Sequence, residues 1–153
     1  MRSFIETLDL RGITLFCQDW GSLIGLRVAA ENEERFARIM LGNGGMPTGD
    51  EDFPRVFKVW RAFPTLVPTE PDNPASDANR LAWKEFAEWN KPFLTTFSNR
   101  DPITRGGDLP SQQIVPGAKD QDHTIVRNAG HFLQEDKGEE LAEILKRFIA
   151  RGT

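Results

Sequence analysis

The chain has 153 residues, long enough for one domain with a hydrophobic core and too short for two domains of ordinary size. Hydrophobic residues make up 39%, mean hydropathy is −0.46, and no apolar run is long enough to span a bilayer, so the composition is that of a soluble globular protein. The net charge is −4, and Lys and Arg are scattered, which argues against nucleic acid as a partner.

Cysteine content and the first residues bear on the compartment. Cys17 is the only cysteine, which excludes an intrachain disulfide. Residues 1–10 contain no apolar signal-peptide core followed by a cleavage site. We therefore expect a cytoplasmic protein with no membrane partner.

The first third of the chain alternates between helix and strand patterns. Residues 4–10 resemble the end of an amphipathic helix, and Arg11-Gly12 predicts a turn. The β-branched and apolar run 13–17 is typical of a buried parallel strand. A helix is expected over 23–30, closing near Asn32, and a second strand over 36–41.

The remaining elements continue this alternation after an irregular middle. Residues 42–78 are rich in Gly, Pro and Asp, with one short helix expected at 56–63. The expected elements that follow are a helix over 80–89, strands over 93–97 and 124–126 with a loop opening at Ser98, and a C-terminal helix whose apolar face carries Leu141, Ile144, Leu145, Phe148 and Ile149. Alternating strands and helices predict an α/β fold with a mostly parallel sheet flanked by helices.

The segment Cys17-Gln18-Asp19-Trp20-Gly21 stands where a strand should pass into a helix. A small residue two before and a glycine two after a central residue is the nucleophile-elbow pattern, in which we expect tight packing to require small side chains on both sides. The central residue here is Asp19 instead of serine. A structural alternative is that Asp19 only caps the following helix.

The sequence resembles the haloalkane dehalogenases, most closely the branch that holds halide with two tryptophans. The resemblance is carried by Leu8-Asp9-Leu10-Arg11, by Gln18-Asp19-Trp20-Gly21 and by Glu34-Arg35-Phe36-Ala37-Arg38-Ile39. It implies that Asp19 is the nucleophile and that Trp20 donates its indole N–H to the departing halide.

Three further roles follow from the same resemblance. His131, within Asn128-Ala129-Gly130-His131, matches the catalytic base, and Asp101, within Asn99-Arg100-Asp101-Pro102, matches the catalytic acid. Phe57-Lys58-Val59-Trp60 resembles the cap segment that supplies the second halide tryptophan, so Trp60 is the matching position.

Each of these residues has a structural alternative. His131 could be a surface loop residue, Asp101 could serve only the Asp-Pro turn, and Trp60 could be a core aromatic. His123 is interpreted as structural, and Trp83 and Trp89 as core residues.

The set is chemically coherent. A carboxylate can displace halide from an sp3 carbon and form an ester that water later hydrolyses, whereas serine would form an ether that resists hydrolysis. His131 would activate the water, Asp101 would orient the ring, and two indole N–H groups would stabilise the leaving halide. The implied partners are a haloalkane, water and halide, and neither a metal nor an organic cofactor is needed.

Composition separates the neighbouring chemistries. Epoxide hydrolases share the Asp, His, Asp arrangement but use cap tyrosines, and this chain has no Tyr. No Gly-x-Ser-x-Gly segment is present, which excludes a serine esterase, and nothing marks the arginine pair of a fluoroacetate-type dehalogenase.

The resemblance covers only part of the family. We expect an incomplete α/β-hydrolase fold in which residues 1–45 form the nucleophile-elbow part of the core, residues 46–79 a reduced cap segment, joined near Arg61 to Pro64, and residues 80–153 the C-terminal part of the core. The family's first strands have no counterpart here, so the edge of the nucleophile strand is expected to be unpaired and to favour self-association. A non-catalytic fragment is the alternative function.

Overall fold

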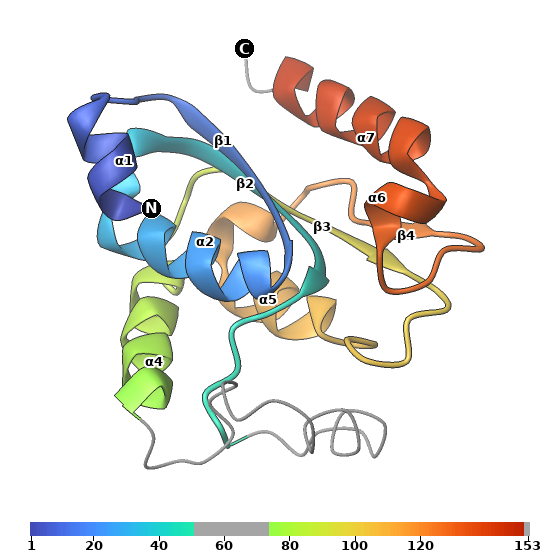
Figure 1. Ribbon diagram of the computed structural model, residues 1–153, viewed down its shortest axis with the longest axis horizontal. Helices are drawn as coiled ribbons and strands as arrows, with labels where there is room; N and C mark the ends of the chain where they lie inside the picture. The colour runs from blue at the N-terminus through green and yellow to red at the C-terminus, as the bar shows by residue number, and fades with distance from the viewer. Residues whose placement is uncertain (51–73, 152–153) are drawn as a thin grey trace.

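The computed structural model describes residues 1–50 and 74–151, and Figure 1 shows their arrangement. The strands are β1 Ile13–Asp19, β2 Phe36–Gly44, β3 Phe93–Ser98 and β4 Thr124–Val126. The α-helices are α1 Arg2–Thr7, α2 Trp20–Glu31, α4 Pro74–Phe86, α5 Asp108–Ile114, α6 Leu133–Asp136 and α7 Gly138–Arg151. Two 3-10 turns, η1 Glu33–Arg35 and η2 Pro116–Ala118, complete them.

The four strands form one parallel sheet in the order β1-β2-β3-β4. Each crossover between neighbouring strands carries helix, as parallel pairing requires. The predicted α/β architecture with a parallel sheet is confirmed, and all strands end at the same edge of the sheet.

Alternate residues of β2 supply two separate cores. Ile39 and Leu41 face α2 and α4, whereas Met40 faces α6 and α7, because successive side chains of a strand point to opposite faces. Figure 1 accordingly shows α2 and α4 on one side of the sheet and α7 on the other.

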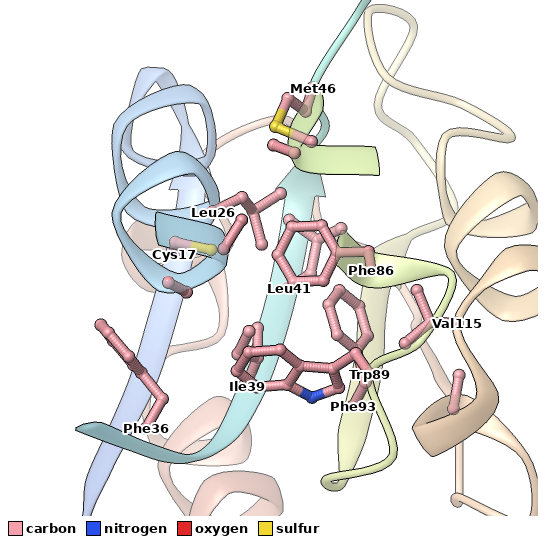
Figure 2. Packing of buried hydrophobic residues seen from close by; sticks show 14 of the residues in the cluster. Cys17, Leu26, Phe36, Ile39, Leu41, Met46, Phe86, Trp89, Phe93 and Val115 are labelled. Carbon is pink, nitrogen blue, oxygen red and sulfur yellow. The ribbon is translucent and has the colours of Figure 1, made fainter. Parts of the chain in front are cut away.

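The larger core is built around an aromatic cluster, which Figure 2 shows between the sheet and α4. Phe86 packs edge-on against Phe93, with ring centroids 5.8 Å apart, and lies 5.5 Å from Trp89. Trp89 is buried, as predicted for a core aromatic, and Trp83 is partly buried against the same cluster with its indole donating to the carbonyl oxygen of Met46 at 2.8 Å. These contacts anchor α4 on the sheet.

The strand β1 departs from its predicted burial. Residues 13–17 were expected to be covered on both faces, but only Cys17 is buried. β1 lies at an edge of the sheet as described, and α6 and α7 cover mainly the strands further along it. The strand is therefore only half covered.

Several predicted boundaries are corrected. α4 begins at Pro74, so the irregular middle ends earlier than residue 78, and the helix ends at Phe86 before turns that lead to Trp89. The loop predicted after Ser98 contains α5. On α7, Leu141, Ile144 and Phe148 are buried, but Ile149 is largely exposed. The helix predicted at 56–63 and the junction near Arg61 lie outside the described residues.

Candidate active site

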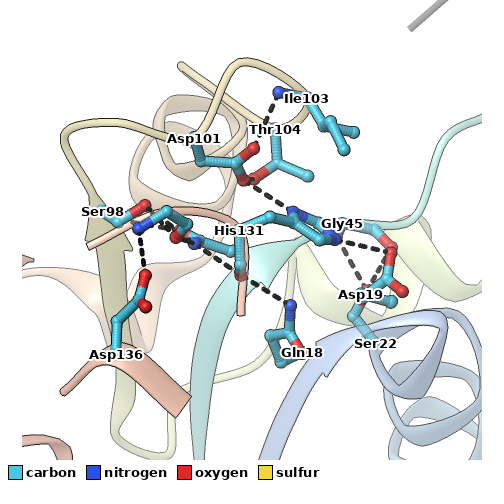
Figure 3. Close-up of polar contacts among 12 residues, drawn as sticks. Gln18, Asp19, Ser22, Gly45, Ser98, Asp101, Ile103, Thr104, His131 and Asp136 are labelled. Atoms are coloured by element: carbon cyan, nitrogen blue, oxygen red, sulfur yellow. Dashed lines mark hydrogen bonds and ion pairs between the residues drawn. The ribbon is translucent and has the colours of Figure 1, made fainter. Parts of the chain in front are cut away.

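The elbow after β1 holds Asp19 in a rare backbone conformation. Its φ of 49° and ψ of −127° lie outside the regions that non-glycine residues ordinarily adopt, which costs about 1–3 kcal/mol. The alternative that Asp19 merely caps α2 is contradicted, because its side chain makes no capping hydrogen bond. The carboxylate instead faces His131 (Figure 3).

Close packing at the elbow comes from residues other than the predicted Gly21. A Cβ at Gly21 would meet no described atom within 4 Å, so the expected steric reason for this glycine is wrong. A Cβ at Gly44, in contrast, would lie 2.6 Å from Ser22 Oγ and 2.8 Å from the backbone nitrogen of Asp19. The hydroxyl of buried Ser22 also accepts the N–H of Gly45 at 2.8 Å, which ties the elbow to the end of β2.

Three of the predicted residues meet at the carboxyl edge of the sheet. His131 Nε2 lies 3.2 Å from Asp19 Oδ1, and His131 Nδ1 lies 2.9 Å from Asp101 Oδ2. The imidazole therefore bridges the two carboxylates (Figure 3). Exposed fractions of the side chains fall from 24% at Asp19 to 11% at His131 and 1% at Asp101, so the ring joins an accessible carboxylate to a buried one.

The buried carboxylate of Asp101 is held ionised by its neighbours. Burial alone would raise the pKa of Asp101, but hydrogen bonds from His131, the Thr104 hydroxyl and the Ile103 N–H together lower it. The alternative that Asp101 serves only its turn is incomplete, because the side chain bonds both the turn and the imidazole.

The two carboxylates act on the imidazole in the opposite sense. Hydrogen bonds to Asp101 and then to Asp19 raise the pKa of His131 to about 9, against the opposing effect of burial. The imidazole ring is consequently protonated at neutral pH in this arrangement.

The sequence also singled out Trp20, Trp60 and His123. Trp20 directly follows Asp19 and lines a groove of about 510 Å³ between α1, α2 and the start of α4. Trp60 lies outside the described residues. The N–H of Thr95 donates to His123 Nδ1 and the ring also bonds the carbonyl oxygen of Ala118, which agrees with a structural role for His123.

The polar residues that hold the His131 loop were not predicted from the sequence. Asn43 is the penultimate residue of β2 and Ser98 ends β3, and both are buried beside the loop. Their position at the carboxyl ends of strands was the available signal. Asp136 accepts the N–H of Gly130 from the other side (Figure 3).

Solved structures share this fold. The haloalkane dehalogenase DpaA from Paraglaciecola agarilytica NO2, described as tetrameric, superposes with a TM-score of 0.83 at 21% identity, over 96% of this chain and 62% of that one. A monoacylglycerol lipase from Paleococcus ferrophilus gives 0.64 at 18% identity, over 99% of this chain and 72% of that one. The chain therefore has part of the α/β-hydrolase fold.

Sequence comparison narrows the class. The chain is 44% identical to a haloalkane dehalogenase of Psychrobacter cryohalolentis, over 97% of this chain and 64% of the relative. It is 41% identical to haloalkane dehalogenase 1 of Mycobacterium bovis, over 92% of this chain and 62% of the relative. Nearly the whole chain is thus homologous to part of the haloalkane dehalogenases. No protein-family model matches it.

The chain spans less than two thirds of the length of these relatives. The Psychrobacter alignment extends over 194 residues, more than the 153 of this chain, so that relative contains internal residues without a counterpart here.

Proposed function

We propose that this chain hydrolyses haloalkanes to an alcohol and halide through an aspartyl alkyl ester. The observation that carries the proposal is the imidazole of His131, placed 3.2 Å from the Asp19 carboxylate and 2.9 Å from that of Asp101. The substrate class comes from the homologous dehalogenases. Water is the second reactant, and the chemistry requires no cofactor.

In the first step, an oxygen of Asp19 attacks the carbon that bears the halogen. The new C–O bond forms as the carbon–halogen bond breaks, and the halide leaves with the electron pair. Trp20 and Trp60 are the proposed indole donors to the halide, by the family resemblance, and Trp20 adjoins Asp19 in the chain. Donors aimed at a developing anion lower the barrier most in a site that excludes water.

In the second step, water attacks the carbonyl carbon of the ester. His131 accepts the proton of the water, Asp101 stabilises the imidazolium, and the alcohol leaves after regaining a proton. Overall, R–X and H₂O give R–OH, X⁻ and H⁺, and Asp19 returns as a carboxylate.

The pKa of His131 depends on whether Asp19 is a carboxylate or an ester. Before reaction the neighbouring carboxylates, Asp101 and Asp19, raise the pKa of His131 to about 9, and the ring is protonated. Esterification removes the negative charge of Asp19 and one of the two hydrogen-bond acceptors of the imidazolium, so the pKa of His131 falls. The ring therefore becomes an effective base once the ester exists.

The experiment is trapping of that ester. Purified His131→Gln protein is incubated with a short bromoalkane, and the peptide containing Asp19 is examined by mass spectrometry. We expect an alkyl adduct with release of about one bromide per chain and then a stall, because displacement needs no base whereas hydrolysis does. Asp19→Ala is the control and should give no adduct. Unmodified His131→Gln protein that turns over like wild type would contradict the proposal.

A second candidate is a non-catalytic member of the family that keeps the site. The incomplete covering of β1 favours it, because a half-covered strand gives little support to the elbow at its end. Self-association through the β1 edge is proposed for the same reason. Absence of both adduct and bromide release from folded protein would favour this candidate.

A further inference from the structure

The side chain of Asn43 is the most completely bonded polar group behind the His131 loop. It is fully buried near the end of the central strand β2. Its Nδ2 lies 2.9 Å from three oxygens, namely Ser98 Oγ and the carbonyl oxygens of Gly130 and His131, and its Oδ1 accepts the N–H of Ser98 at 2.8 Å.

This arrangement allows only one orientation of the amide. Turning the amide over would place its oxygen against two carbonyl oxygens and its NH₂ group against the N–H of Ser98. A side chain that can both donate to the loop and accept from β3 is therefore required here, and asparagine meets this need without carrying a charge.

Two neighbours reinforce the same carbonyl groups. The Ser98 hydroxyl donates to the carbonyl oxygen of Gly130 at 2.7 Å, and Gln18 Nε2 donates to that of His131 at 2.9 Å. Gln18 precedes Asp19 on β1, Asn43 lies on β2 and Ser98 ends β3. Three adjacent strands thus hold the backbone of the loop residue whose ring bridges the carboxylates.

We infer that Asn43 is a positioning residue, which fixes the backbone of Gly130 and His131 so that the imidazole spans Asp19 and Asp101. The inference rests on the proposed function in assigning a catalytic purpose to this geometry. Asn43 itself lies behind the loop and bonds backbone groups, so it acts through His131.

The test reads the imidazole directly and needs no turnover. The chain has two histidines. The NMR signal that is missing from the His131→Gln protein therefore identifies His131 in the wild-type spectrum. Wild-type His131 should titrate near pH 9. In Asn43→Leu, which keeps the branched shape of the side chain but removes the amide, the midpoint should fall by about 1 pH unit or more, because a displaced ring loses its carboxylate bonds.

Asn79→Leu is the matched control. Asn79 is an equally buried amide whose hydrogen bond goes to a backbone carbonyl oxygen outside the His131 loop, that of Pro47. Both variants lose stability, so a purely structural role of Asn43 would lower the melting temperature of both and leave the titration of His131 unchanged in both. A folded Asn43→Leu protein with the wild-type midpoint would overturn the inference.

If Asn43→Leu does not fold, Ser98→Ala tests the positioning role of Asn43 instead. It removes one hydroxyl that bonds the Asn43 amide and the Gly130 carbonyl, and it should lower the midpoint in the same direction by a smaller amount. An unchanged midpoint in folded Ser98→Ala protein would then overturn the inference. The outcome is separate from that of ester trapping: a shifted midpoint without any adduct supports Asn43 and rejects the proposed reaction.

Discussion

Asp19, the proposed nucleophile, has a backbone conformation that opposes folding. Its φ of 49° is paired with a ψ of −127°, which even the left-handed helical region does not include. In this conformation the carboxylate faces His131. Stability is therefore spent on the geometry of the site, as is common at active sites.

Comparison of Asp19→Gly with Asp19→Ala measures this strain. Both variants lose the carboxylate, so they differ only in the Cβ at a strained position. We expect the glycine variant to be more stable by about 1–3 kcal/mol in chemical denaturation. Ala142→Gly, on the exposed face of α7, is the control and should destabilise by about 1 kcal/mol. Equal stability of the two Asp19 variants would mean that the elbow is unstrained.

His131 makes stability depend on pH in a defined window. Its pKa of about 9 in the folded protein exceeds the ordinary value of 6.5, so its contribution is complete below about pH 6.5 and is lost as pH rises through 9. We expect the free energy of unfolding to fall by on the order of 3 kcal/mol across this range. Asp101 stays ionised throughout, because its pKa is lowered in the folded protein.

Denaturant titrations at a series of pH values check this slope, with His131→Gln as the control that should lack it. Measurements are best stopped near pH 9. Burial raises the pKa of the Cys17 thiol to about 12 from its ordinary value of 9.0. Above pH 9 the thiol therefore ionises in the unfolded chain but not in the folded one, which lowers the free energy of unfolding further. A wild-type slope equal to that of His131→Gln would show that the imidazole is not held between carboxylates.

At the scale of elements, the junction of β1, α2 and β2 determines where Asp19 can stand. The end of β2 approaches the elbow so closely that Gly44 leaves no room for a side chain. Ser22 links the first turn of α2 to the same segment. The end of β2 therefore has as much influence on the elbow as the residues that flank Asp19.

Alanine at the two glycines should have opposite effects. In Gly44→Ala the new Cβ would meet backbone and Ser22 at under 3 Å, so we expect a loss of about 2 kcal/mol or more and a displaced Asp19. In Gly21→Ala the Cβ meets open space within α2, where alanine favours helix, and stability should hold or rise slightly. Thermal melts of both proteins check this. Greater damage from Gly21→Ala would restore the sequence-based explanation of the elbow.

At the scale of the whole molecule, the α1 and β1 side of the described chain is the least covered. Phe4, Leu8 and Ile24 are 60%, 55% and 52% exposed, and β1 lies at an edge of the sheet as described. None of the described helices is long and apolar enough to cross a membrane. Apolar side chains beside an unpaired strand edge favour pairing with another copy of the chain.

We accordingly expect light scattering to detect particles larger than a monomer, in a fraction that rises with protein concentration. Phe4→Lys with Leu8→Lys should shift the population toward monomer, because charge beside an edge strand opposes pairing. Leu109→Lys, at an equally exposed apolar position on α5, is the control and should not. A compact monomer that melts cooperatively at every concentration would contradict the expectation.

Much of this protein could be predicted from the chain alone. The strand-helix alternation predicted the parallel sheet, since period and turn residues are local properties. The segments around Asp19 and His131 carried the resemblance to the haloalkane dehalogenases, and both follow strands, where α/β proteins place reactive residues. Boundaries were less secure: α4 begins six residues before the first residue predicted for it, at Arg80.

Other features depended on contacts between segments distant in sequence. The roles of Gly44 and Asn43 arise where β2 meets the elbow and the His131 loop. The residues next to them in sequence give no signal of these roles. The shallow burial of β1 is likewise a property of the assembled sheet. Local propensity and pattern determined which elements form and which side chains are candidates for catalysis. Only tertiary packing decided how close the elements approach, and with that the distances of His131 from its two carboxylates and the hydrogen bonds behind it.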